Sequence, residues 1–137
     1  MRSCTRHLDG KRFETIVGRH RIITDQPVAT GGTDGGPTPP ELLLASLGAC
    51  AGHYAVEYLC ARSLPLTGLE ISVVAEKATS PARLASFCVE VRLPGIEDRH
   101  RQGLLRAVKA CLIHNTLKAG PQIEVEVSVS DSLCQSS

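Results

Sequence analysis

Residues 38–62 constrain the fold of this chain most, because they carry the start signal, the length and the end signal of one long helix. Thr38-Pro39-Pro40-Glu41 has the form of a capping box, with Thr at the N-cap, Glu three residues later and proline at the first helical position. Pro65 marks the end of the helical run. We therefore predict a helix that continues to about Arg62.

The middle of this predicted helix, residues 45–52, is dense in small side chains. Small side chains let another backbone approach closely, so we expect this face to be buried against a second helix. The apolar run over residues 42–51 is interrupted by Ser46 and is too short to span a bilayer. Because the helix is apolar around most of its circumference, we expect the chain to be an obligate dimer.

Alternation of apolar and polar residues predicts strands on both sides of the helix. An N-terminal meander is expected over residues 13–24, preceded by a hairpin turn at Asp9-Gly10. Two strands are expected over residues 69–75 and 87–93, then one helix from about Glu97 to Gly120-Pro121, and a last strand over residues 123–129. The order β-β-β-α-β-β-α-β defines an α+β fold. We see no linker, so residues 1–137 are expected to form a single domain.

Charge and cysteine content exclude several functions. The net charge is +1 with acids and bases interspersed, which argues against a nucleic-acid partner and a membrane surface. The polar N-terminus gives no sign of a signal peptide. We therefore expect a cytoplasmic protein whose six cysteines serve redox or metal chemistry rather than a disulfide scaffold. Because C-x-x-C and zinc-finger spacings are absent, no metal and no cofactor are predicted.

Two cysteines are candidates for reactivity. Cys50 lies among small apolar residues, where a buried structural cysteine is the common alternative. Cys111 has Lys109 beside it and His114 three residues later, near an expected helix end. An ammonium or imidazole group close to a sulfur favours the thiolate, which is the reactive form of cysteine.

Both cysteines lie in motifs that resemble those of the OsmC/Ohr family (osmotically inducible protein C and organic hydroperoxide resistance protein). The second motif is Cys111-Leu112-Ile113-His114-Asn115-Thr116-Leu117. The first is Gly36-Pro37-Thr38-Pro39-Pro40-Glu41-Leu42-Leu43-Leu44-Ala45-Ser46-Leu47-Gly48-Ala49-Cys50. The resemblance extends over nearly the whole chain and keeps the order of the two motifs.

The resemblance implies a thiol-dependent peroxidase that reduces small organic hydroperoxides. Cys50 would be the peroxidatic cysteine and form a sulfenic acid. Cys111 would be the resolving cysteine, and an external dithiol would reduce the resulting disulfide. Glu41 would help to hold an active-site arginine. The implied fold is an intertwined homodimer with two mixed sheets around central helices.

Glu41 and Cys50 lie on opposite faces of a straight helix, roughly 13.5 Å apart along its axis. They would meet only across a dimer interface, or if the helix bends near Gly48. The alternative is that Glu41 serves as the carboxylate of the capping box.

The chain departs from the family pattern at two positions. Leu8 stands where the peroxidase branch has an arginine before the Asp-Gly turn. Four arginines could replace it, of which Arg12 is nearest in the hairpin; the others are Arg6, Arg19 and Arg21. Leu112 stands where the family often has proline, so we expect the helix to run through Cys111. Free N–H groups of a new helix start would then be lacking.

His53 and Glu57 follow Cys50 at i+3 and i+7 and share its helix face. They could form a local base for the thiol, a solvated polar pair or part of a metal site. A rival function also stays open. Without the family arginine, the same scaffold could be a binding module for a small apolar or thiol-bearing ligand, with little or no peroxidase activity.

Overall fold

The computed structural model describes residues 1–129, in which the chain forms two compact units. Of the described residues, the first unit contains 1–42 and 123–129, and the second contains 43–122. Strands and helices are both present, in the order expected as far as the last helix, which confirms the α+β class. That residues 1–137 form a single domain stays a prediction.

The first unit is built on a three-stranded antiparallel meander in the order β1-β2-β3. Its strands are β1 (Cys4–Asp9), β2 (Arg12–Val17) and β3 (His20–Thr24). Gly10 and Gly18 form the two turns with φ of +47° and +58°, a left-handed conformation that glycine adopts without steric cost. The predicted N-terminal meander is confirmed.

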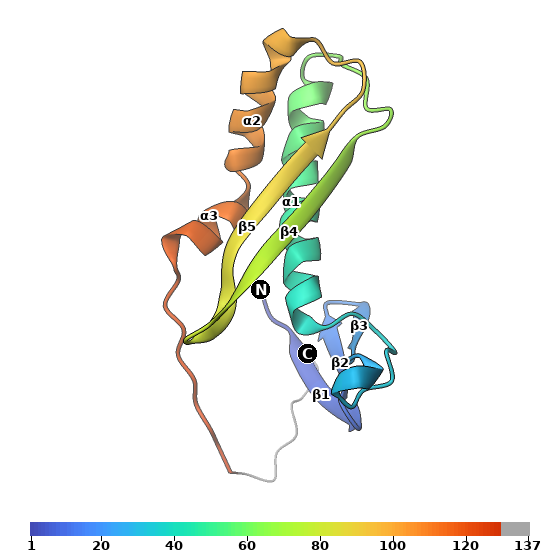
Figure 1. Cartoon of the computed structure of the whole chain (residues 1–137), viewed down its shortest axis with the longest axis vertical. Coiled ribbons are helices and arrows are strands. Elements are labelled where there is room, and N and C mark those ends of the chain that lie inside the picture. The colour runs from blue at the N-terminus through green and yellow to red at the C-terminus, as the bar shows by residue number, and fades with distance from the viewer. Residues whose placement is uncertain (130–137) are drawn as a thin grey trace. The chain divides into compact units, whose positions relative to one another are not determined.

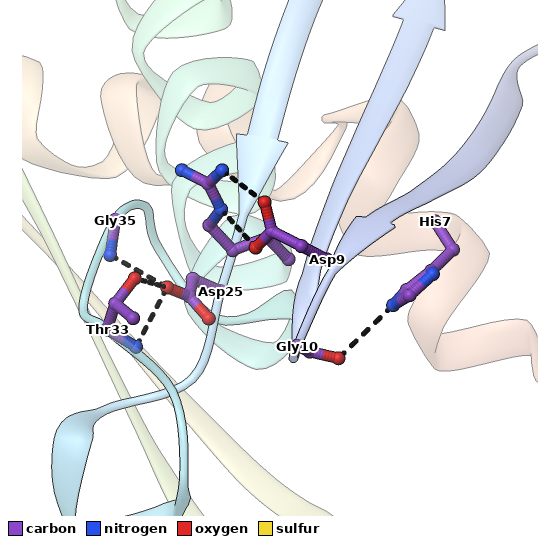
Figure 2. Close-up of polar contacts among 7 residues, drawn as sticks. His7, Asp9, Gly10, Asp25, Thr33 and Gly35 are labelled. Atoms are coloured by element: carbon purple, nitrogen blue, oxygen red, sulfur yellow. Dashed lines mark hydrogen bonds and ion pairs between the residues drawn. The ribbon is translucent and has the colours of Figure 1, made fainter.

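A buried carboxylate fixes the loop that follows β3. Asp25 is 1% exposed, and one of its oxygens accepts hydrogen bonds from the Thr33 hydroxyl (2.7 Å), the Thr33 N–H (3.0 Å) and the Gly35 N–H (3.0 Å) (Figure 2). The Gln26 N–H donates to the other oxygen at 2.7 Å. These donors, the Thr33 hydroxyl foremost, hold the pKa of Asp25 well below its usual range.

Two glycines let this loop pass close to the neighbouring backbone. A Cβ atom at Gly32 would collide with the carbonyl of Gln26, and one at Gly36 would collide with the carbonyl of Ile23. The loop, which includes the 3₁₀ turn η1 (Val28–Thr30), therefore owes its path to backbone packing and to Asp25. It contains no phosphate-loop fingerprint.

The second unit combines helices with a long hairpin. Helix α1 (Pro39–Cys60) begins in the first unit and continues into the second, where the antiparallel strands β4 (Glu70–Thr79) and β5 (Ala82–Arg92) follow it. The 3₁₀ turn η2 (Asp98–His100) leads into α2 (Arg101–Lys109), and α3 (Leu112–Ala119) ends the unit. Figure 1 shows α3 set at a marked angle to α2.

The core of the second unit lies between α1, α2 and the hairpin. Every fourth residue of α1 is buried along one helix face: Leu47, Ala51, Ala55 and Leu59. Three of them pack with Leu93 and with two residues of α2, Leu104 and Val108. By length and composition alone α1 could cross a membrane, but this packing is that of a core helix.

Two glycines of α1 face a strand, whereas the small residue Ala51 packs in the core with α2. A Cβ atom at Gly48 would lie 3.2 Å from the Val73 side chain, and one at Gly52 would lie 3.4 Å from the Ile71 side chain. Both contacts are with β4. The prediction that this face packs against a second helix is therefore wrong for the two glycines, which instead let the sheet approach α1 closely.

The helix predicted from Glu97 to Gly120 is interrupted. α2 ends at Lys109, and Cys111 adopts a non-helical conformation (φ −53°, ψ 133°) as the N-cap of α3. The expectation that one helix runs through Cys111 is wrong. Its predicted end is confirmed, because Gly120 caps α3 in the left-handed conformation (φ +65°).

The last predicted strand is absent from the described part of the chain. Residues 121–129 form no strand, and the apolar residues of the segment are strongly exposed: Ile123 81%, Val125 83%, Val127 88% and Val129 100%. The alternation that predicted a strand is real, but a strand needs a neighbour for its N–H and C=O groups.

Candidate active site

Because the helix is interrupted between α2 and α3, the N-terminus of α3 lies directly after Cys111. Cys111 is fully buried, and its carbonyl accepts the first hydrogen bond of α3, from the Asn115 N–H at 3.0 Å. The Asn115 side chain also donates to the carbonyl of Ala110 at 3.4 Å. The first N–H groups of a helix have no partner within it, so those of α3 are available to a neighbouring acceptor.

That acceptor is the sulfur of Cys50. Cys50 lies on α1, partly buried, and its sulfur receives hydrogen bonds from the Cys111 thiol and from the N–H groups of Ile113 and Leu112. Partial burial raises the pKa of Cys50, but the three hydrogen bonds outweigh burial and the net pKa is lowered. A negative charge at this sulfur is also favoured by the positive end of the α3 dipole.

Cys111 is shifted in the opposite direction. Burial raises its pKa, and so does its hydrogen bond to Cys50, in which Cys111 is the donor; the N–H groups of His114 and Ile113 only partly offset this. Because two interacting thiols titrate as a pair, the first proton leaves the pair from Cys50. The arrangement therefore makes Cys50 the more acidic of the two thiols and Cys111 the one that keeps its proton longer.

The activating groups differ from those expected. Main-chain N–H groups of α3, rather than the side chains of Lys109 and His114, act on the two sulfurs. The prediction that α3 would lack a helix start, and hence its free N–H groups, is wrong. The roles of Leu112 and Ile113 were missed by sequence reasoning. A usable signal was the family proline at position 112, because proline favours the first position of a helix.

Glu41 serves the start of α1. One of its carboxylate oxygens accepts hydrogen bonds from the Thr38 N–H (2.7 Å) and from the Thr38 hydroxyl (2.9 Å). The half of the predicted capping box in which the glutamate accepts from the N-cap N–H is therefore present. That Glu41 also holds an active-site arginine stays a prediction.

Arg12, the nearest candidate for the missing family arginine, is engaged in its own hairpin. Its guanidinium donates to both carboxylate oxygens of Asp9, at 2.9 and 2.6 Å, and this contact raises the pKa of Arg12 and lowers that of Asp9. Figure 2 places Asp9 in the same region as Asp25 and its loop. Leu8 lies at a bulge between β1 and β2 and is 40% exposed. A role for Arg12 at Cys50 stays a prediction.

His53 and Glu57 are exposed on α1. The His53 ring makes an edge contact with the Tyr54 ring, with centroids 5.5 Å apart, and neither His53 nor Glu57 is among the groups that shift the pKa of Cys50. No cluster of three histidine, cysteine or acidic residues suited to a metal ion occurs in residues 1–129. His114 contributes its backbone N–H to Cys111 and is one of the residues that line a groove.

An α+β fold that holds one activated thiol against a second thiol defines a candidate thiol-based redox site. Residues 32–126 match the family model of OsmC-like proteins, and the chain belongs to this family. No curated protein sequence matches the chain.

Three solved structures place the fold among OsmC-like proteins. One, from Psychrobacter arcticus 273-4, is described as an osmotic stress induced and detoxification response protein (20% identity, 83% of this chain and 85% of that one, TM-score 0.76). An OsmC-like protein from Mycoplasma pneumoniae has 25% identity, with 87% of each chain covered and a TM-score of 0.66. An organic hydroperoxide resistance protein OsmC from Legionella pneumophila has 17% identity (86% and 90% covered, TM-score 0.60).

Proposed function

We propose that this protein is a thiol-dependent peroxidase that reduces organic hydroperoxides. The Cys50 thiolate attacks the terminal peroxide oxygen, an S–O bond forms as the O–O bond breaks, and the alkoxide leaves and takes a proton from water to become the alcohol. Cys50 becomes a sulfenic acid. The Cys111 thiol then displaces water from it to give a disulfide, and an external dithiol reduces that disulfide by thiol–disulfide exchange. These steps suit a reducing compartment such as the cytoplasm.

The observation that carries the proposal is the contact between the two sulfurs. Cys50 has a lowered pKa and accepts a hydrogen bond from Cys111, whose pKa is raised. The first group is suited to attack, since the thiolate is the nucleophile. The second retains its proton and is already at the sulfur that it would resolve. A relative from Legionella pneumophila that carries the name organic hydroperoxide resistance protein supports the choice of substrate.

Consumption of cumene hydroperoxide with dithiothreitol as reductant tests the proposal. The wild-type chain is expected to turn over, and Cys50→Ser is expected to lose activity to the background rate. Cys111→Ser should complete one turnover and then stall or overoxidise. Cys88→Ser is the matched control, because Cys88 is exposed on β5 and should leave the rate unchanged. Equal rates for wild type and Cys50→Ser would overturn the proposal.

We further propose that the working form is a homodimer. The segment from Ile123 to Val129 exposes four apolar side chains at alternate positions. Exposed apolar surface of this kind marks an interaction site, and a second copy of the chain would cover these side chains.

The oligomeric state, measured by light scattering after gel filtration, tests this part. Val127→Asp is expected to weaken the dimer by placing a charge among the apolar positions. Ser128→Asp is the matched control, because it adds the same charge at the neighbouring polar position. A wild-type chain that stays monomeric at micromolar concentration would overturn the dimer.

A further inference from the structure

A groove of about 810 Å³ runs through the second unit, and neither Cys50 nor Cys111 is among its lining residues. Its volume lies within the range of roughly 300–1,000 Å³ that is usual for small-molecule sites. Most of its lining is apolar and comes from α1, β5, α2 and α3, including Leu43, Leu47, Leu84, Phe87, Leu105 and Leu117. Because the lining is mostly apolar, the larger part of a ligand that fits this groove would be a hydrocarbon chain.

The polar part of the lining is basic. Lys109 from the last turn of α2, and His114 and Lys118 from α3, line the groove. Within residues 1–129 neither ammonium group forms an ion pair with a carboxylate. The two lysines come from different helices, and both line the same groove.

No acidic residue offsets these charges in the groove lining of the described chain. Residues 99–119 contain no aspartate or glutamate at all. Glu76 accepts a hydrogen bond of 3.2 Å from Ser86, which lines the groove, but Glu76 is not itself a lining residue. The groove thus pairs an apolar wall with an uncompensated positive charge, which is complementary to a negatively charged amphiphile.

We infer that the groove binds a single-chain amphiphile with an anionic head group, such as a carboxylate, and that Lys109 and Lys118 hold the head. The apolar lining takes up the chain. This site needs neither the nucleophilicity of Cys50 nor a peroxide group on the ligand, so it goes beyond the proposed peroxidase reaction.

Binding of dodecanoate to the full chain, measured by titration calorimetry below the micelle-forming concentration, tests the inference. Dodecyltrimethylammonium is the matched probe with the same chain and the opposite charge. Dodecanoate is expected to bind more tightly, and less tightly as salt is added, because salt screens partly exposed charges. Each methylene removed from the carboxylate series should weaken binding by about threefold to fourfold.

Substitution of the lysines locates the head group. Each of Lys109→Gln and Lys118→Gln is expected to weaken dodecanoate binding by a factor of about two to five, and the double variant by roughly tenfold. Arg106→Gln is the control, because Arg106 also lies in the last turn of α2 but does not line the groove. Equal binding of the two probes, no binding of either, or an unchanged double variant would overturn the inference. Since dodecanoate contains no peroxide, failure of the peroxidase proposal would leave these results untouched.

Discussion

The thiol of Cys111 donates a hydrogen bond to the sulfur of Cys50, and this contact adds to burial and to the N–H groups of α3 in moving the two pKa values apart. It lowers the pKa of Cys50, the acceptor, and raises that of Cys111, the donor. A hydrogen bond to the charged form of a group favours that form. The contact therefore makes one of two residues of the same type more acidic than the other.

Removal of the Cys111 donor should make Cys50 less reactive. In Cys111→Ala the Cys50 sulfur loses the thiol donor, so its pKa should rise and its alkylation by iodoacetamide at neutral pH should slow. Cys111→Ser retains an O–H donor and should lie closer to wild type. The rate at Cys50 is measured against pH by mass spectrometry of peptides, with exposed Cys60 as internal reference. If the pH at which the alkylation rate of Cys50 is half its maximum is the same in wild type and in Cys111→Ala, this role of Cys111 is contradicted.

Leu112→Pro should remove one main-chain donor and leave the helix start intact. Proline is tolerated at the first position of a helix but has no N–H. A hydrogen bond to a charged acceptor contributes about 1.5 kcal/mol or more, so alkylation of Cys50 at neutral pH should slow by roughly tenfold. Leu112→Ala retains the N–H group and is the control. If both variants react alike, the Leu112 N–H does not activate the thiol.

The stability of the protein should fall in acid because of Asp25. Its hydrogen bonds place the pKa in the folded state below the unfolded value of about 3.9. A lowered pKa means that the stabilisation is present above the unfolded pKa and is lost as pH falls below about 4. Urea unfolding at a series of pH values should show this decline. Asp25→Asn should be less stable at neutral pH and should show a shallower decline, and parallel curves for the two chains would argue against Asp25 as its source.

Truncation of a core side chain should be costly. Leu59 of α1 is fully buried in the core of the second unit, and Leu59→Ala should lower the free energy of unfolding by about 2–5 kcal/mol. Leu66→Ala is the comparison, because Leu66 is 39% exposed and leaves a smaller cavity. Urea titrations of the two variants provide the measurement, and similar midpoints would place Leu59 outside the core.

Local signals explain which parts of the fold could be predicted from the sequence. Three local signals act within a few residues and form as expected: the hydrogen bond of Glu41 to the Thr38 N–H, the glycine turns, and the alternation in β4 and β5. The contact of Gly48 with Val73 is not local, because small residues accept a helix or a sheet equally well. The missing strand after Ile123 is also non-local, since its pairing depends on a neighbour.

The candidate site was predicted in part. Motif similarity singled out Cys50 and Cys111, which the structure brings into contact. The donors from Leu112 and Ile113 were missed because no glycine or proline marks the break at Ala110. A sequence shows which side chains are charged. The main-chain N–H groups that act on these sulfurs are present in nearly every residue and so leave no mark in the sequence. Their position depends on where a helix begins.

Because the N–H donors to Cys50 belong to the main chain, the acidity of this thiol is tied to the path of the backbone. The side chains at positions 112 and 113 can be substituted without loss of the N–H donors, provided that α3 still begins after Cys111. A shift of that helix start by one residue would redirect both N–H groups even if every side chain near the sulfur were kept. The site should therefore be robust to substitution and sensitive to insertion or deletion in the short joint between α2 and α3.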